Sequence, residues 1–164
     1  MGKSIGPIPT VIGLCLIALA ACAHPGPKVS LAQVPPGKSG SARVWFLRPT
    51  ISTSPAVQAF SPVIYVNDAP VAAIPIETAF YRDFAPGTYR FMVQTNGGFP
   101  TDRVTALQLV PGTEYFLDVD WVPSWNLGYP YIAGSQNFAT FAIIPMGPQV
   151  AQAYLPTLHY LGEQ

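Results

Sequence analysis

Charged residues are scarce in this chain. Asp, Glu, Lys and Arg make up 10% of its 164 residues, against roughly 25% in an ordinary soluble protein, and the eight acids balance the eight bases. The sequence also contains no run of basic residues. Because proteins bind nucleic acids largely through clustered Lys and Arg at the phosphates, we expect no nucleic-acid partner.

Cysteine and histidine are nearly absent from the body of the chain. Cys15 and Cys22 both lie near the N-terminus, and the two histidines are His24 and His159. The rest of the chain can therefore form no disulfide and no Cys-ligated metal site. The sequence also lacks the Gly-x-Ser-x-Gly, His-Glu-x-x-His and Gly-rich phosphate-binding motifs. We predict a protein that is not an enzyme and that uses no cofactor or metal.

The N-terminal residues have the pattern of a secretion signal. Lys3 precedes an apolar run over residues 11–21, which is shorter than the roughly 20 residues that span a bilayer. The run ends in Leu-Ala-Ala directly before Cys22, which resembles the bacterial lipobox. We expect residues 1–21 to be removed as a lipoprotein signal peptide and the Cys22 thiol to carry a diacylglycerol. The alternative is an ordinary secretory signal cleaved after Ala-x-Ala, with Cys22 coincidental.

A lipid on Cys22 implies a place in the bacterial envelope. By resemblance to the sorting rule of well-studied Gram-negative bacteria, Ala23 after the cysteine indicates the periplasmic face of the outer membrane. Pro, Gly, Ser and Lys dominate the stretch that follows, so residues 22–41 are expected to form a flexible tether. We interpret His24 as a solvated residue of that tether.

Residues 42–164 have the pattern of a single domain built from short strands. Alternating apolar and polar residues, punctuated by turn-forming Pro, Gly, Asn and Asp, predict a small antiparallel β-sandwich of immunoglobulin-like or transthyretin-like type. Apolar residues then recur at helical spacing after Pro148, which predicts a short C-terminal helix that Pro156 breaks. The expected strands are residues 42–48, 63–66, 71–74, 77–84, 89–94, 103–110, 114–122 and 137–144.

Two Pro-Gly-Thr sequences, residues 86–88 and 111–113, precede strands. Pro sets the φ of the second position of a type II turn, and Gly accepts the positive φ of the third. The strand after the second turn has the clearest alternation in the chain. It predicts one inward set, Tyr115, Leu117, Val119 and Trp121, and one set facing mostly water, Glu114, Phe116, Asp118 and Asp120.

Asp118 and Asp120 are two residues apart on this strand and therefore lie side by side on one face. Two carboxylates could bind Ca²⁺ or act as an acid and a base, but either role needs further ligands or an environment that separates their pKa values. Glu114 is the one obvious third acid on that face. We interpret the pair as solvated acids that keep the sheet face soluble.

Several of these features occur together in one known family. The lipobox is followed by an opening strand, a hairpin and the two Pro-Gly turns, at residues 42–49, 65–68, 86–89 and 112–117. In this order the chain resembles uncharacterised proteobacterial lipoproteins of the domain of unknown function 2846 type, over about residues 42–161. The resemblance implies a small β-sandwich in the envelope and implies no chemistry. The longer segment at residues 51–61 and the aromatic loop described next depart from the family pattern.

An aromatic loop is expected between the last two strands, over residues 123–136. Trp125, Tyr129 and Tyr131 lie there beside Asn126 and glycine. Flat aromatic rings with neighbouring polar groups suit stacking on sugars or anchoring a protein contact. The alternative is that the rings fold back and cap the open end of the sandwich.

These features predict a lipid-anchored envelope protein of non-enzymatic function. We expect a protein-interaction or structural module in the periplasm, bound to the membrane through its lipid and to an envelope protein through a surface poor in charge. The alternative function is a carbohydrate-binding module for peptidoglycan or another polysaccharide, with Trp125, Asn126, Tyr129 and Tyr131 as its binding residues.

Overall fold

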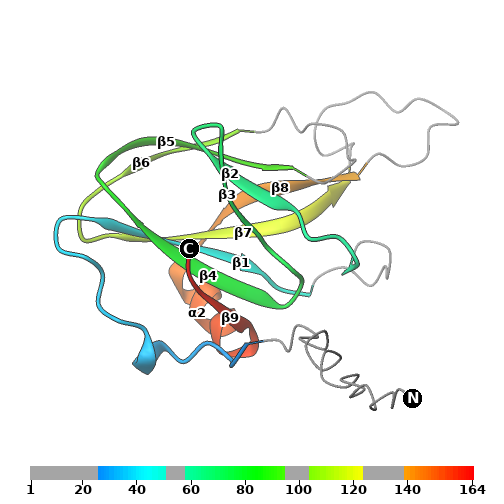
Figure 1. Ribbon diagram of the computed structural model, residues 1–164, viewed down its shortest axis with the longest axis horizontal. Helices are drawn as coiled ribbons and strands as arrows, with labels where there is room; N and C mark the ends of the chain where they lie inside the picture. Colours follow the sequence, from blue (N-terminus) through cyan, green and yellow to red (C-terminus); the bar gives the residue numbers. More distant parts are fainter. Residues whose placement is uncertain (1–25, 51–57, 95–103, 124–138) are drawn as a thin grey trace, which may run out of the picture.

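The computed structural model describes residues 26–50, 58–94, 104–123 and 139–164, and these form a small β-sandwich with one short C-terminal α-helix (Figure 1). The predicted fold class is therefore confirmed. A five-stranded sheet has the order β8-β7-β1-β4-β9, and a four-stranded sheet has the order β3-β2-β5-β6. The elements are η1 (Leu31–Gln33), β1 (Ala42–Arg48), β2 (Val63–Val66), β3 (Ala69–Ala73), β4 (Thr78–Phe84), β5 (Gly87–Gln94), β6 (Thr105–Leu109), β7 (Glu114–Pro123), β8 (Ala139–Met146), α2 (Pro148–Tyr154), η3 (Leu155–Thr157) and β9 (His159–Glu163).

Most strand pairs are antiparallel, as predicted, but two pairs in the five-stranded sheet are parallel. Strand β1 pairs with β7 in parallel, and β4 pairs in parallel with β9, which the sequence analysis did not predict as a strand. Neither parallel pair is joined by a tight turn, and a turn is the local signal from which a strand direction can be read.

The turns explain how the chain moves between strands and between sheets. Asn67 and Asp68, with φ of 49° and 67°, form the two-residue connection of the β2–β3 hairpin. Gly112 has a φ of 72°, the left-handed value expected at the third position of a type II turn, whereas Gly87 is more extended at 151°. Both Pro-Gly-Thr turns are corners at which the chain crosses from one sheet to the other, from β4 to β5 and from β6 to β7.

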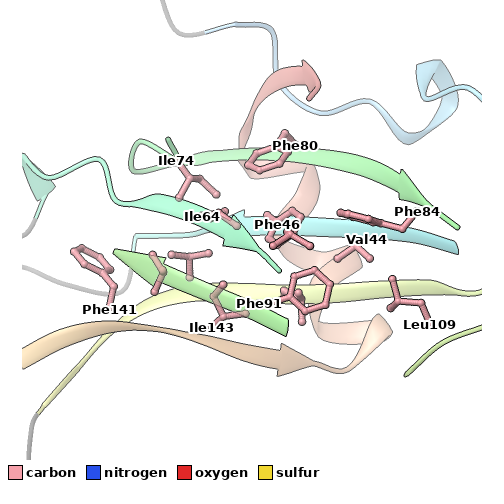
Figure 2. Close-up of a cluster of buried hydrophobic side chains, with 14 of the residues drawn as sticks. Val44, Phe46, Ile64, Ile74, Phe80, Phe84, Phe91, Leu109, Phe141 and Ile143 are labelled. Carbon is pink, nitrogen blue, oxygen red and sulfur yellow. The ribbon is translucent and has the colours of Figure 1, made fainter. Parts of the chain in front are cut away.

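The main hydrophobic core lies between the two sheets (Figure 2). Phe46 stacks on Phe80 with ring centroids 4.9 Å apart and contacts Phe91 at 5.9 Å. Val44, Leu117 and Val119 are buried with them. Leu117 and Val119, two of the residues predicted to point inward on β7, are therefore core residues.

A second core lies on the other face of the five-stranded sheet. Trp45, Leu47 and Phe116 of this sheet are packed there against Val29, Ala151, Leu155 and Leu158. The prediction that Phe116 and Asp118 point to water is wrong, because both residues are buried. Phe116 lies in this second core, under helix α2 and the chain before β1. A strand buried on both faces carries a continuous apolar run, as β1 does between its two arginines.

The chain before β1 lies against the domain from residue 26 onward. We call residues 26–41 the N-terminal strap. Val29 N–H donates to the Leu158 carbonyl at 2.8 Å, Tyr160 N–H donates to the Pro27 carbonyl at 2.7 Å, and Val29 is only 4% exposed. This arrangement differs from the flexible tether expected for residues 22–41. The strap forms backbone hydrogen bonds with the C-terminal segment at Leu158 and Tyr160, and it buries Val29. Residues 22–25 lie outside the described residues.

Candidate functional site

A buried arginine fastens the strap to the five-stranded sheet. Arg43 of β1 is 4% exposed and binds Asp83 of β4 in a bidentate pair, with Nε–Oδ1 of 2.8 Å and Nη2–Oδ2 of 3.0 Å. Its guanidinium also donates to the carbonyls of Pro35 and Pro36 at 2.6 and 3.3 Å, and it lies 3.9 Å from the ring centre of Tyr81. These hydrogen bonds use most of its five donors.

The same contacts set the electrostatics of the pair. The Arg43 hydrogen bonds hold the pKa of Asp83 below its usual value, and the backbone N–H of Lys38, 3.1 Å from Asp83 Oδ2, acts in the same direction. Asp83 in turn raises the pKa of Arg43. Both groups are therefore charged at neutral pH, and their role is to hold the strap rather than to exchange protons.

A cleft of about 240 Å³ lies between the strap and helix α2. Trp45 and Phe116 are among its lining residues, together with Leu31 and Leu155. The volume is below the roughly 300–1,000 Å³ of typical small-molecule sites. Arg43 is engaged with Asp83 and two carbonyls, so its charge is not available to a ligand, and we do not assign a ligand to this cleft.

Asp118 is the most unusual titratable group in the described residues. Its side chain is 7% exposed, and its Oδ1 is buried without a hydrogen-bond partner. Burial raises its pKa to about 7, and the neighbouring Asp120 adds to the shift. The interpretation of Asp118 as a solvated acid is therefore wrong. The alternation of β7 alone assigns this position to solvent, whereas in the folded domain it is buried.

Asp120 differs from Asp118 in its surroundings. It is half-buried, its Oδ1 accepts a 2.7 Å hydrogen bond from the backbone N–H of Trp121, and burial raises its pKa. Asp118 and Asp120 thus lie in different surroundings, as an acid and a base of one reaction would need. Asp118, however, lines neither of the two described cavities. In the described parts of the chain, no group of three or more His, Cys, Asp or Glu side chains is placed to hold a metal ion.

A packed cluster of side chains lies where β7 and β8 lead into and out of the predicted aromatic loop. Arg48 is 2% exposed, donates to the Ile74 carbonyl at 2.9 Å and to the Phe60 carbonyl, and lies 4.8 Å from the ring centre of Phe141. Trp121 meets Phe141 edge-on at 5.1 Å. Burial lowers the pKa of Arg48, but the group remains charged at neutral pH. The space among these residues is about 10 Å³, which is too small for a ligand.

The outer face of the four-stranded sheet is the broadest described surface with no layer over it (Figure 1). Tyr65 and Met92 are cross-strand partners on this face, and both are half-buried. Farther along β5 and β6 on the same face, Thr88 and Gln108 hydrogen-bond each other at 2.6 Å. The described charges at this surface are the exposed pair Arg90 and Asp68, 3.3 Å apart. We call this surface the open sheet face.

The binding and lipidation residues predicted from sequence fall outside the described residues. This applies to Cys22 and to all four loop residues, Trp125, Asn126, Tyr129 and Tyr131. The choice between a loop that binds and a loop that caps the core therefore stays a prediction.

His159, whose ring Nδ1 contacts the Gly26 carbonyl, is half-buried in the described structure.

Four buried ionisable side chains, Arg43, Asp83, Arg48 and Asp118, were not predicted from the sequence. A signal for the two arginines was present, because they lie within or at the end of an apolar run that predicts burial on both faces. A charge on such a strand needs a buried partner. Asp118 had no comparable signal, since its strand alternates.

None of the helices in the described residues is long and apolar enough to cross a bilayer. Comparison with known proteins found that no family model matches this chain and that no curated protein matches it significantly.

Proposed function

We propose that this protein is a lipid-anchored module of the bacterial envelope, attached through Cys22 at the periplasmic face of the outer membrane. We further propose that it acts without catalysis, by contact with another envelope protein. The observation that carries the second part is the open sheet face. It presents Tyr65 and Met92 at a paired position, and its described charges are limited to the exposed pair Arg90 and Asp68. Tyrosine and methionine are enriched in the cores of protein interfaces, and charges are depleted there.

The lipid anchor is tested by changing Cys22 to Ala. We expect the wild-type chain to fractionate with membranes and to carry the mass of an acylated cysteine, and the variant to lose that added mass because it has no thiol to form the thioether. Cys15→Ala is the matched control and should leave lipidation unchanged. A Cys22→Ala protein with the same mass and the same lipid content as the wild type would exclude the anchor.

The protein contact is tested by changing Met92 to Lys on the open sheet face. A charge placed in an interface core must be desolvated, so we expect cross-linked partners in intact cells to fall by about tenfold or more, the equivalent of about 1.4 kcal/mol. Thr113→Lys adds the same charge at an exposed turn away from this face and should have little effect. Both variants should unfold at nearly the wild-type temperature.

Unchanged capture by Met92→Lys would contradict the proposed contact surface. Sedimentation of the wild-type protein with purified peptidoglycan, without any protein cross-link, would instead support the carbohydrate-binding alternative. The two assays separate these functions because the cross-linking assay detects protein partners, whereas the sedimentation assay contains only the polysaccharide.

A further inference from the structure

The strap joins the domain very close to the cysteine that is proposed to carry the lipid. Three residues, Ala23 to Pro25, separate Cys22 from Gly26. A fully extended chain spans at most about 3.6 Å per residue, so the four steps from Cys22 to Gly26 reach no farther than about 14 Å. From Gly26 onward the strap follows the C-terminal segment, with the Pro27 carbonyl bonded to Tyr160 N–H at 2.7 Å.

The strap and helix α2 lie together on one side of the five-stranded sheet, and the four-stranded sheet lies on the other side (Figure 1). We call residues 26–37 and 146–158, which form the cover of the five-stranded sheet, the outer layer. The lipid-bearing end of the chain thus enters the domain on the outer-layer side. The open sheet face is separated from that side by two sheets, which pack roughly 10 Å apart.

The composition of the outer layer fits a membrane surface. It contains one charged residue, Lys28, and no acid, and the acid beside it is Glu114 of β7, which lines the cleft between its two segments. Its exposed apolar side chains include Leu31 at 47%, Val150 at 52% and Tyr154 at 37%. Tyrosine is favoured at the level of the headgroups, and a lysine near an anionic surface adds about 1 kcal/mol of attraction.

We propose that the outer layer rests against the lipid headgroups, so that the open sheet face is turned away from the bilayer. This inference rests on the proposed lipid anchor at Cys22 and deepens it, because it assigns the bilayer as the partner of a defined surface. A long flexible tether would let the domain take any orientation relative to the bilayer. The short connection from Cys22 and the strap packed on the domain restrict that orientation. The open sheet face is then presented to the periplasm.

The cysteine content of the chain makes this orientation measurable. Cys15 leaves with the signal peptide and the Cys22 sulfur is held in a thioether, so one introduced cysteine is the single reactive thiol of the mature protein. Val150→Cys places a polarity-sensitive fluorophore on the outer layer, and Thr88→Cys places it on the open sheet face. The full lipidated protein is reconstituted in phosphatidylethanolamine and phosphatidylglycerol vesicles that contain a headgroup spin-labelled lipid.

We expect the label at residue 150 to be quenched several-fold more strongly than the label at residue 88 and to have a blue-shifted emission. Equal quenching at both positions, or stronger quenching at residue 88, would overturn the orientation while the lipid anchor stands. Self-quenching that grows with protein density would assign the outer layer to a second copy of the chain and would also overturn it. Absence of acylated Cys22 by mass spectrometry would overturn the anchor and the orientation together.

Discussion

Replacing Asp118 by Asn is expected to stabilise the protein near pH 8 by about 2–4 kcal/mol and to have little effect near pH 4. Asp118 is buried, its Oδ1 has no hydrogen-bond partner, and its pKa is raised from 3.8 to about 7. The main cause is the loss of hydration, since an ionised carboxylate in a dry environment has few groups to replace water. An amide of nearly the same shape is neutral at every pH.

The sign of the effect follows from proton binding in the two states. The unfolded chain ionises Asp118 near its ordinary pKa of 3.8, whereas the folded chain keeps the proton until about pH 7. Between these values the folded state binds more protons, so stability falls as the pH rises. Each pKa unit is worth about 1.4 kcal/mol, which sets a ceiling of roughly 4 kcal/mol, and the cost of burying an unpaired amide lowers the expected gain.

Urea unfolding of the wild-type and Asp118→Asn proteins across this pH range measures the effect. Asp68→Asn is the matched control, because Asp68 is exposed and lies in a left-handed turn position that asparagine also tolerates. The control should change stability by less than about 0.5 kcal/mol. A gain from Asp118→Asn that does not depend on pH would show that its carboxyl group is ionised in the folded protein even under acidic conditions.

Replacing Asp83 by Ala is expected to destabilise the protein by about 3–5 kcal/mol, because it leaves the Arg43 guanidinium buried without its counter-charge. The Arg43 side chain is 4% exposed and the Asp83 side chain is 1% exposed. The variant also removes the acceptor of the Lys38 N–H. Thermal unfolding at neutral pH measures the loss. The pKa of Asp83 is below its ordinary value, so the stability from this pair is present above that value and is lost as the pH falls through the lowered pKa.

The exposed pair Arg90 and Asp68 offers a matched control on the same domain. Arg90→Ala should cost less than about 1 kcal/mol, since side chains that are 53% and 64% exposed interact through water. Combining Asp83→Ala with Arg43→Met should cost less than the sum of the two single changes, because the double variant contains no unpaired buried charge. Additive effects would show that the Arg43 and Asp83 charges do not depend on each other.

Arg43 variants should also release the strap. The guanidinium holds the carbonyls of Pro35 and Pro36, so its loss is expected to expose this stretch to proteases at temperatures where the sheets remain folded. The outer layer thus depends on Arg43, a residue that the strand pattern alone does not distinguish from its neighbours.

Most of the strands were predictable because their signals are local. The runs that became β1, β2 and β5 alternate or are continuously apolar over a few residues, and Asn67-Asp68 and Pro111-Gly112 carry the backbone angles that their turns need. The C-terminal helix was predicted for the same reason, and it ends at Tyr154, directly before the turn that contains Pro156. Strand β9 was missed because its five residues include a glycine at a φ of 93°.

The candidate surfaces were predictable only in part. The lipobox-like sequence and the predicted aromatic loop are sequence patterns, and they lead to Cys22 and to residues 123–136 without any knowledge of the fold. The open sheet face and the outer layer are not sequence patterns. Tyr65 and Met92 lie 27 positions apart in the chain and meet only because β2 pairs with β5.

The sequence by itself determined a charge-poor β domain, the turns that join its strands and the lipobox-like pattern that precedes it, since each depends on neighbouring residues. Only the tertiary structure decided which faces of the sheets are covered. The strap and α2 lie far apart in the sequence, yet both close over β1 and β7, and this cover buries Phe116, whose position in the alternation of β7 predicts exposure to water. Burial depends on what packs against a residue, and the residues that pack here come from the two ends of the described chain.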